Sequence, residues 1–363
     1  MTGGANAVRE PRALLVTGGA GFIGSAFIRY LFGSAGFTGK LVNLDLLTYA
    51  GNVANVAGVF ADPRYRFVRG DIRDGELVAR LVGEHAIDAI VHFAAESHVD
   101  RSIALPDAFI ETNIVGTFRL LEVVRRFPYL HFHHVSTDEV FGSLGATGAF
   151  REDSPYHPNS PYSAAKAAAD HLVRAYAHTY GLSVTLSNSS NNYGPYQLPE
   201  KLVPLMLANL LAGAPLPVYG DGGNVRDWLF VEDHVEALWS ILRRGRAGET
   251  YNVGGGEERT NLELVALLIE RVAAATGKSR EALERLLTFV PDRPGHDRRY
   301  AIDCEKLRRE LGWSPRHTLA TGLDETVRFY LERPDWVADA LKAAGRDDRR
   351  VFLAPTSRDP RPP

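Results

Sequence analysis

Cysteine is nearly absent from this sequence, because Cys304 is the only one among 363 residues. A single thiol cannot form an internal disulfide, so a buried core must hold the fold together, as is usual in a reducing compartment. The sequence also lacks an apolar run of about 18 residues, the length that suggests a membrane span, and its N-terminus lacks the apolar core of a signal peptide. These absences predict a cytoplasmic protein without a membrane partner.

An excess of charge of one sign is also missing. The 41 Lys and Arg residues nearly balance 44 Asp and Glu residues, which gives a formal net charge of −3. This balance provides no electrostatic footprint for nucleic acid, so we predict that nucleic acid is not a partner. The ends, residues 1–11 and 341–363, are rich in polar residues, Gly and Pro, and we predict that both are flexible.

Short, β-rich apolar runs alternate with amphipathic segments of helical length from residue 12 to about residue 188. The helical segments lie near residues 22–32, 74–83, 107–126 and 161–180. Such alternation predicts a Rossmann-type α/β fold, a doubly wound parallel sheet with helices on both faces. The predicted strands are Ala13–Thr17, Leu41–Asp45, Tyr65–Arg69, Ala89–Phe93, Phe132–Ser136 and Ser183–Ser187.

The sequence pattern changes after residue 190, where Pro and Gly interrupt short strands and scattered helices. These helices are predicted near residues 202–212, 232–243, 261–276 and 317–332. We therefore predict an NAD-binding Rossmann domain over residues 1–190. A smaller, irregular α/β lobe over residues 191–340 is predicted to bind the substrate and to return some strand or helix to the first domain.

A glycine-rich turn lies between the first predicted strand and helix, where Gly18, Gly21 and Gly24 are spaced by three residues. Glycine lets the backbone approach a pyrophosphate and the helix N-terminus supplies N–H donors, although any tight turn would also favour glycine. Asp45 ends the second strand about 20 residues later, where a carboxylate binds both ribose hydroxyls. Leu46 follows, and no Arg is present for a 2′-phosphate, so we predict NAD rather than NADP.

Two further strand ends offer cofactor contacts. Asp71-Ile72 follows the third strand and either flanks an adenine or forms a turn. His92–Ser97 follows the fourth strand; its small Ala94 and Ala95 let the backbone pass close to a flat cofactor, and the Ser97 hydroxyl lies beyond. A tightly packed strand exit is the alternative interpretation.

Tyr162 and Lys166 are four residues apart at the start of a predicted helix, so both side chains lie on one helical face. A tyrosine with its ordinary pKa of about 10 is a poor base at neutral pH. An adjacent ammonium and the positive nicotinamide ring of NAD favour the phenolate. The spacing occurs by chance in many helices, but the glycine turn upstream and the Ser136-Thr137 strand end favour a catalytic pair.

Two carboxylates, Asp138 and Glu139, directly follow Ser136-Thr137. By position alone they are turn residues, a helix cap, or an acid and a base.

Three neighbouring histidines, His131, His133 and His134, look like a metal cluster. Alternation along a strand sends adjacent side chains to opposite faces, and no matching Cys or His set stands at ligand spacing. We therefore predict no metal site.

Taken together, these motifs resemble the extended short-chain dehydrogenase/reductase superfamily and, within it, the dTDP-glucose 4,6-dehydratase family. The blocks span roughly residues 13 to 330 in the family's order. Ala165 and Phe141, where the family often has Ser and Tyr, replace no residue with a chemical role. The blocks are TGGAGFIG (17–24), HFAAESHVDRSI (92–103), STDEVFG (136–142), YSAAK (162–166), SNNYGPYQLPEKLVP (190–204), YGDGGNVRDWLFVEDH (219–234) and DRPGHDRRYAID (292–303).

The resemblance implies an NAD-dependent lyase that converts dTDP-glucose to dTDP-4-keto-6-deoxyglucose and water. Tyr162 would take the proton of the 4-hydroxyl, with Lys166 tuning the phenol and Thr137 binding the 4-oxygen, while hydride passes from C4 to NAD. Glu139 would then remove the C5 proton, Asp138 would protonate the departing 6-hydroxyl, and hydride would return to C6. The two carboxylates could equally share these roles.

The resemblance also implies binding residues. Arg226 and His296 would grip the diphosphate, and Pro217 and Tyr219 would bracket the thymine. From the residues alone, Arg226 could form a surface ion pair with Asp227, and His296 could belong to a turn, as could the neighbouring Asn191 and Asn192. The implied cofactor contacts are Gly18, Gly21, Phe22, Ile23, Gly24, Asp45, Leu46, Thr48, Asp71, Ile72, Phe93, Ala94, Ala95, Ser97, Thr112, Tyr162, Lys166 and Asn192. The implied substrate contacts are Ser97, Thr137, Asn191, Lys201, Leu202, Pro217, Tyr219, Arg226, Asn261, Arg293 and His296.

The resemblance also implies an oligomeric state. In the superfamily the helices near 107–126 and 161–180 pair across a dimer axis, so the resemblance implies a homodimer through a helix bundle.

The closest alternative is another sugar-nucleotide enzyme, a UDP- or GDP-sugar dehydratase or a 4-epimerase, but an epimerase needs no acid–base pair at C5 and C6. A non-catalytic NAD-binding protein would be expected to lose Tyr162, Lys166 or the acid pair, and all are present.

Overall fold

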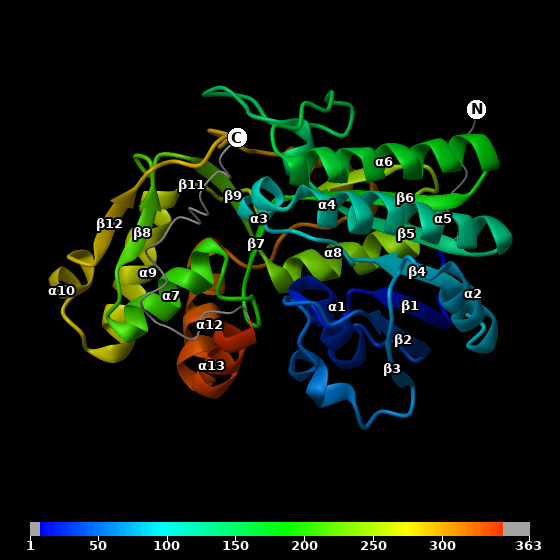
Figure 1. Ribbon diagram of the computed structural model, residues 1–363, viewed down its shortest axis with the longest axis horizontal. Helices are drawn as coiled ribbons and strands as arrows, with labels where there is room; N and C mark the ends of the chain where they lie inside the picture. Colours follow the sequence, from blue (N-terminus) through cyan, green and yellow to red (C-terminus); the bar gives the residue numbers. More distant parts are fainter. Residues whose placement is uncertain (1–7, 344–363) are drawn as a thin grey trace, which may run out of the picture.

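The structure is a computed structural model that describes residues 8–343. Residues 1–7 and 344–363, which hold most of the two ends predicted to be flexible, lie outside the described residues. The main feature is a seven-stranded parallel sheet in the order β10-β6-β5-β4-β1-β2-β3 (Figure 1). Its strands are β1 (Ala13–Thr17), β2 (Lys40–Asp45), β3 (Tyr65–Arg69), β4 (Ala89–His92), β5 (His131–Thr137), β6 (Ser183–Ser189) and β10 (Thr250–Val253).

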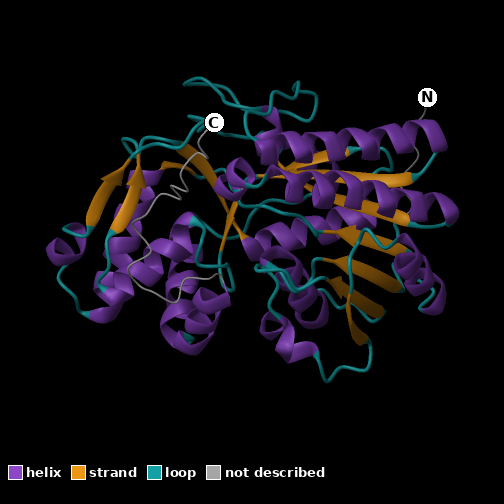
Figure 2. Ribbon diagram, in the orientation of Figure 1, coloured by secondary structure: helices purple, strands orange, loops and turns teal. Residues whose placement is uncertain are grey.

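Helices cover both faces of this sheet (Figure 2). One face packs against α1 (Phe22–Gly33) and α8 (Val231–Arg244). The other packs against α2 (Gly75–Glu84), α5 (Thr117–Arg126) and α6 (Pro161–Tyr180). Strands covered on both faces read as continuous apolar runs, as in fully buried Ala13–Thr17. The Rossmann-type fold predicted from the strand–helix alternation is confirmed.

The order of the strands reverses at β1, which lies between β2 and β4. In open α/β sheets the crevice beyond the carboxyl ends of the strands at such a reversal is the usual ligand site. The glycine turn after β1 and the segments after β4 and β5 therefore meet at the same edge of the sheet.

The segment predicted as a helix near residues 107–126 is helical throughout, but it is not a regular α-helix over its whole length. It consists of α4 (Pro106–Phe109), the π-helical turn η2 (Ile110–Gly116) and α5, and it follows the short α3 (Val99–Ala104). In η2 the Asn113 side chain exchanges hydrogen bonds with the backbone of Glu96, at 2.9 and 3.0 Å. These hydrogen bonds fix the segment after β4, which lines the crevice, to the π turn, a kind of turn that frequently occurs at functional sites.

The second lobe is built on two small sheets. One holds β7 (Asn191–Tyr193), β9 (Val225–Phe230) and β11 (Glu258–Thr260), and the other holds β8 (Leu216–Tyr219) and β12 (Leu287–Val290). Their apolar core is shared with α7 (Leu202–Ala212), α9 (Asn261–Thr276), α10 (Arg280–Glu284), α12 (Leu319–Glu332) and α13 (Pro334–Ala343). The remaining short elements are η1 (Val53–Val59), η3 (Asp138–Phe141) and α11 (Glu305–Leu311).

The chain crosses between the lobes more than once. After β9 it runs through α8 under the large sheet, and β10 then pairs with β6 at the edge of that sheet. Residues 231–253 therefore complete the Rossmann sheet although they follow the first strands of the second lobe in the sequence.

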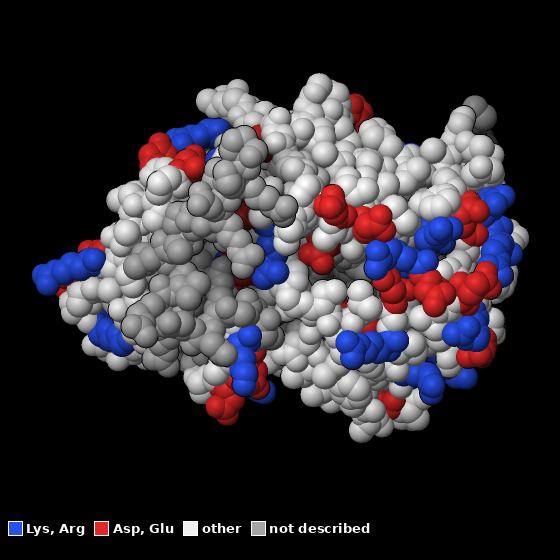
Figure 3. Space-filling view, in the orientation of Figure 1, with Lys and Arg blue, Asp and Glu red and all other residues white. Residues whose placement is uncertain are grey.

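The surface is mixed in charge. On the face drawn in Figure 3, positive and negative side chains are interspersed over the Rossmann lobe. Among residues 8–343, no helix combines the length and apolar character that crossing a membrane requires.

Candidate active site

A cleft of about 360 Å³ opens at the carboxyl edge of the large sheet and is walled by both lobes. All of the predicted cofactor contacts line it, as do the predicted catalytic residues Thr137, Asp138, Glu139, Tyr162 and Lys166. Of the predicted substrate contacts, Ser97, Asn191, Lys201 and Leu202 also line it together with Thr137. Pro217, Tyr219, Arg226, Asn261, Arg293 and His296 lie outside this lining, in the second lobe.

The glycine turn leaves no room for side chains. Gly18 has a φ of +70°, and a Cβ there would lie 2.6 Å from the Ala94 nitrogen. A Cβ on Gly24 would lie 2.3 Å from the Gly18 carbonyl oxygen. Gly21 caps α1 without a side-chain hydrogen bond, so the first N–H groups of the helix stay available to a ligand. A pyrophosphate fits this cradle.

Asp45 lies at the end of β2, beside the turn. Its Oδ2 accepts a hydrogen bond from the Ala20 amide at 2.9 Å and its Oδ1 accepts one from the Leu47 amide at 2.8 Å. Burial raises the pKa of Asp45, and these two backbone bonds act in the opposite direction. The carboxylate is thus fixed at the edge of the cleft where a ribose is expected, and the residues present fit NAD.

A wall of the cleft that the sequence did not predict comes from α13. Trp336 and Ala340 belong to the second lobe and line the cleft together with the glycine turn of the Rossmann lobe. The Trp336 Nε1 donates to Asn55 Oδ1 at 2.9 Å, and the Asn55 Nδ2 donates to the Ala20 carbonyl at 3.0 Å. A chain of two hydrogen bonds therefore ties the last described helix to the nucleotide turn.

The predicted catalytic side chains come from two elements. Thr137 ends β5, Asp138 and Glu139 begin η3, and Tyr162 and Lys166 lie in the first two turns of α6. The start of α6 is fixed by a capping box between Ser160 and Ser163, with Pro161 at its first position.

The environments of the two carboxylates differ. Burial, and then the charge of Glu139, raise the pKa of Asp138 well above its usual value. Burial also raises the pKa of Glu139, but Arg293, Lys201 and Arg226 oppose that rise. The Asp138 Oδ2 is buried without a hydrogen-bond partner among the described residues. This arrangement favours the proton on Asp138 and the charge on Glu139.

Tyr162 and Lys166 are also buried. Burial, followed by the charge of Glu139, raises the pKa of the Tyr162 phenol, while a hydrogen bond with Thr137 lowers it. Burial lowers the pKa of Lys166 to about 8, and the charge of Asp170 opposes this. The Lys166 Nζ donates to the Val135 carbonyl at 2.8 Å. Burial therefore favours the neutral phenol of Tyr162 in the protein alone, and the positive charge of a bound nicotinamide ring would favour the phenolate.

In the second lobe Arg226 is buried and does not pair with Asp227. Its guanidinium donates to the Asp297 carbonyl at 2.9 Å and lies 4.3 Å from the centre of the Tyr300 ring. Asp227 instead accepts the amides of Gly255 and Glu257, at 2.9 and 2.7 Å. The surface ion pair, which the sequence left open, is thus absent.

The other second-lobe candidates surround the loop after β12. The His296 Nδ1 lies 2.6 Å from Asp292 Oδ1, and its ring centre lies 6.3 Å from that of Tyr219. Arg293 lies 3.8 Å from Asp100 of the first lobe. Pro217 and Tyr219 belong to β8, and Asn261 begins α9.

The three histidines of β5 alternate as predicted. His131 and His133 both contact the Thr185 hydroxyl, at 2.9 and 2.8 Å, whereas His134 lies 3.2 Å from Asp170. Burial lowers the pKa of all three. They are core side chains with polar neighbours.

Comparison with known proteins gives consistent matches. Residues 15–326 match the family described as GDP-mannose 4,6 dehydratase. A dTDP-glucose 4,6-dehydratase of Xanthomonas campestris pv. campestris (strain B100) is 56% identical, over 92% of this chain and 97% of its own. The structure of DesIV, a dTDP-glucose 4,6-dehydratase from Streptomyces venezuelae with NAD bound, superimposes with a TM-score of 0.85 at 51% identity, over 90% of this chain and 99% of its own. A UDP-glucose 4-epimerase from Thermotoga maritima is more distant, at 30% identity and a TM-score of 0.79, over 89% of this chain and 99% of its own.

Proposed function

The chain belongs to the dTDP-glucose 4,6-dehydratase family, and we propose that it converts dTDP-glucose to dTDP-4-keto-6-deoxyglucose and water with NAD. The observation that carries this function is the pair Asp138 and Glu139, which shares one cleft with Tyr162 and Lys166. An epimerase needs only an oxidising pair at C4. A protonated and an ionised carboxyl beside it provide the acid and the base that water loss requires.

The first step is removal of the proton from the 4-hydroxyl. Tyr162 takes this proton, and Thr137 donates a hydrogen bond to the 4-oxygen; both side chains line the same cleft. Lys166 stabilises the phenolate through its charge, held by the Val135 carbonyl. Bound NAD, held by the glycine turn and Asp45, supplies the acceptor and donor of the two electrons.

The second step is loss of water across C5 and C6. The 4-ketone acidifies the C5 proton, and Glu139 removes it because its three cationic neighbours favour the ionised form. Asp138 donates its proton to the departing 6-hydroxyl, which its raised pKa supports. The raised pKa of Asp138 and the cationic neighbours of Glu139 support this division of the two roles.

Binding of the sugar nucleotide uses both lobes. Asn191 faces the sugar, and its Oδ1 is buried without a partner among the described residues. Lys201 and Leu202 line the cleft beyond it, and the Lys201 Nζ donates to the Ser97 carbonyl at 2.6 Å. Arg226, Arg293 and His296 bind the diphosphate, whose charge requires fixed donors. Pro217, Tyr219 and Asn261 hold the nucleoside.

A panel of sugar nucleotides tests the function. The purified chain with NAD is expected to convert dTDP-glucose, but not UDP-glucose or GDP-mannose, to a product with the alkaline absorbance of a 4-keto-6-deoxy sugar. Turnover of UDP-glucose without turnover of dTDP-glucose contradicts the substrate assignment. Formation of the 4-epimer instead of the keto sugar contradicts the dehydratase reaction.

Assembly as a homodimer is part of the proposal. The helices α5 and α6 lie side by side on one face (Figure 1), and α6 exposes Ala164, His171 and Ala175 along its outer side. A second copy packed on this surface would form a four-helix bundle. Light scattering is expected to give a dimer for the unmodified chain and a monomer for Ala175→Arg. The control is Ala274→Arg, on the exposed side of α9.

A cytoplasmic location is also part of the proposal, and it agrees with the single cysteine.

A further inference from the structure

A buried carboxylate that this mechanism does not use lies beneath the catalytic pair. Asp170 is fully buried on α6, four residues after Lys166 and eight after Tyr162. Side chains at this spacing share one face of a helix, so the three lie in a row along α6. A fully buried carboxylate away from solvent requires partners that stabilise its charge.

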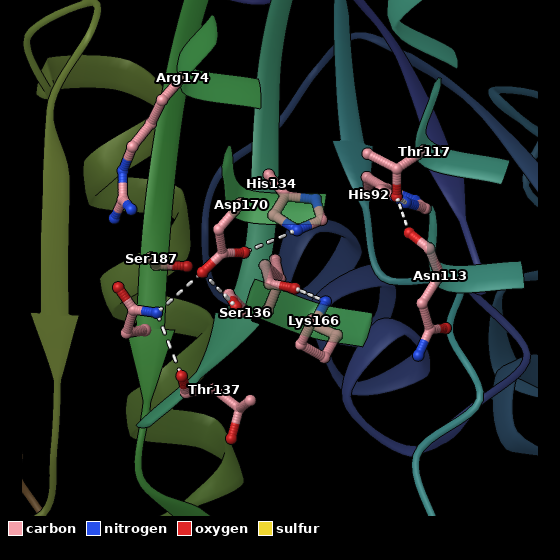
Figure 4. A network of polar contacts seen from close by, with 12 residues as sticks. His92, Asn113, Thr117, His134, Ser136, Thr137, Lys166, Asp170, Arg174 and Ser187 are labelled. Atoms are coloured by element: carbon pink, nitrogen blue, oxygen red, sulfur yellow. Dashed lines mark hydrogen bonds and ion pairs between the residues drawn. The ribbon is translucent and has the colours of Figure 1, made fainter. Parts of the chain in front are cut away.

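The partners of Asp170 come from β5, β6 and the loop before α6, and Figure 4 shows the contacts of Asp170 with His134 and Ser136 of β5. Its Oδ2 accepts hydrogen bonds from the Ser136 hydroxyl at 2.9 Å and from the Tyr156 hydroxyl at 2.8 Å. The Asn188 Nδ2 lies 3.4 Å from the same oxygen, and the His134 Nε2 lies 3.2 Å from Oδ1. Although burial opposes it, the contact with His134 and the charge of Lys166 hold the pKa of Asp170 below its usual value. The carboxyl is therefore ionised at neutral pH.

The groups that face Lys166 leave Asp170 as its counter-charge. His134 of β5 and His92 of β4 are the other titratable neighbours, together with Tyr162. Burial lowers the pKa of His134 to about 4 and that of His92 well below its usual value, so both are neutral at pH 7. Arg174, farther along α6, bonds to the Tyr156 hydroxyl at 2.7 Å. Within the described residues, Asp170 is the anion that opposes the effect of burial on Lys166.

The same carboxylate also holds the end of β5. The Val135 carbonyl that binds Lys166 lies between His134 and Ser136, whose side chains both contact Asp170. The Asn188 Nδ2 bridges Asp170 to the Thr137 carbonyl, which it meets at 3.1 Å. One buried group thus contacts the segment that orients Lys166 and the segment that carries Thr137.

We propose that Asp170 is a positioning residue for the reaction, keeping Lys166 cationic and fixing the strand end that carries Thr137. It acts through these two residues and does not touch the substrate. The proposal rests on the proposed function, since Lys166 serves the same site.

Titration of Lys166 tests the first part without any substrate. In protein labelled with ¹⁵N-lysine, the Nζ signal missing from Lys166→Met identifies Lys166. Its pKa is expected to fall by about one unit in Asp170→Asn, because the counter-charge is lost while burial remains. Tyr156→Phe, which removes one hydrogen bond to Asp170 but not its charge, is the matched control and is expected to leave that pKa in place. An unchanged Lys166 pKa in Asp170→Asn overturns the proposal whether or not dTDP-glucose is turned over; Asp170→Ser serves if the Asn variant does not fold.

The pH profile of kcat tests whether the effect reaches the reaction. The alkaline limb is expected to move to lower pH in Asp170→Asn, since Lys166 loses its proton earlier, and kcat at pH 8 is expected to fall about fivefold. In the Lys166→Met background the same substitution is expected to lower kcat by a clearly smaller factor, because the part that acts through Lys166 is already lost and only the part that acts through Thr137 is left. Equal losses in both backgrounds identify a merely structural residue and overturn the proposal.

Discussion

Asp138 combines deep burial with an oxygen, Oδ2, that has no hydrogen-bond partner among the described residues. The pKa of this carboxyl in the folded protein is raised above its unfolded value, so the native state keeps a proton that the unfolded state loses. The contribution of Asp138 to the free energy of unfolding is therefore greatest below the unfolded pKa of about 4. This contribution is lost as the pH rises through the folded pKa. The residue that supplies the proton for water loss thereby destabilises the fold at neutral and alkaline pH.

Asp138→Asn separates these two effects. The difference in Tm between this variant and the unmodified chain is expected to grow in the variant's favour from pH 4 to pH 8, while dehydration falls about 100-fold or more. Thermal unfolding followed by circular dichroism measures the first effect and product formation the second. The exposed Asp153→Asn is the control. A Tm difference independent of pH contradicts a buried, protonated Asp138.

Glu139→Gln addresses the second carboxylate. Oxidation at C4 is expected to persist slowly, whereas exchange of the C5 proton with solvent deuterium is expected to stop, because the amide cannot accept that proton. Mass spectrometry of recovered dTDP-glucose and product measures the exchange. Unimpaired exchange would remove Glu139 from the role of base.

Among single residues, the sequence predicted the side chains that line the cleft better than the buried side chains that hold them in position. Tyr162, Lys166 and the glycines belong to short local motifs, so their spacing was enough. Asp170 is also on the Tyr162–Lys166 face, but its partners Ser136, Tyr156 and Asn188 come from three separate segments. No local pattern brings such partners together, and only the folded chain identifies Asp170 as a buried counter-charge.

Among the elements, α13 has the least expected position. The last helix predicted from the sequence ended near residue 332, but α13 follows directly and its Trp336 donates a hydrogen bond to Asn55. Tyr196, held at a φ of +68°, packs against Trp336 with ring centres 5.6 Å apart. These contacts keep the helix against the nucleotide side of the cleft.

Trp336→Phe tests the contribution of α13. The ring contacts remain but the hydrogen bond to Asn55 is lost, so the affinity for NAD is expected to fall by about threefold to tenfold with little change in kcat at saturating NAD. Calorimetry of NAD binding to the NAD-stripped protein measures this. Trp313→Phe, buried beside α11 and outside the cleft lining, is the control. Equal NAD affinity in both variants would show that α13 does not contribute to NAD binding.

The π turn η2 is a feature that the helical spacing of apolar residues did not predict. Residues 107–126 carry apolar residues at helical spacing, which predicts one helix, but seven of them form a π turn. A side-chain and backbone exchange with Glu96, more than a dozen residues away, stabilises the altered turn. Such a tertiary contact leaves no mark on the local pattern.

For the whole molecule, the main question is where cooperative units begin and end. The sequence predicted a boundary at residue 190 with some return to the first domain. In the structure α8 packs against α1, and β10 pairs with β6, so residues 231–253 share the core of the Rossmann sheet. Pairing between strands more than 60 residues apart depends on the completed sheet, which is why the pattern of β10 alone did not identify its position.

Hydrogen exchange tests this assignment. The amides of residues 250–253 and 231–244 are expected to open together with β5 and β6 in sub-denaturing urea, because units that share a core unfold as one. Amides of β9 and β11 are expected to open with the second lobe. Exchange of β10 together with β9 and β11 instead of β6 would contradict a shared unit.

The contact between Trp336 and Asn55 spans 281 residues of sequence. During synthesis the glycine turn leaves the ribosome before α13 is made, and at about 5–20 residues per second the intervening chain takes many seconds to follow. The glycine turn of a nascent chain is therefore without the contact to Trp336 for that time. The order of synthesis thus sets the order in which this side of the cleft is built, with the nucleotide turn first and the helix that covers it later.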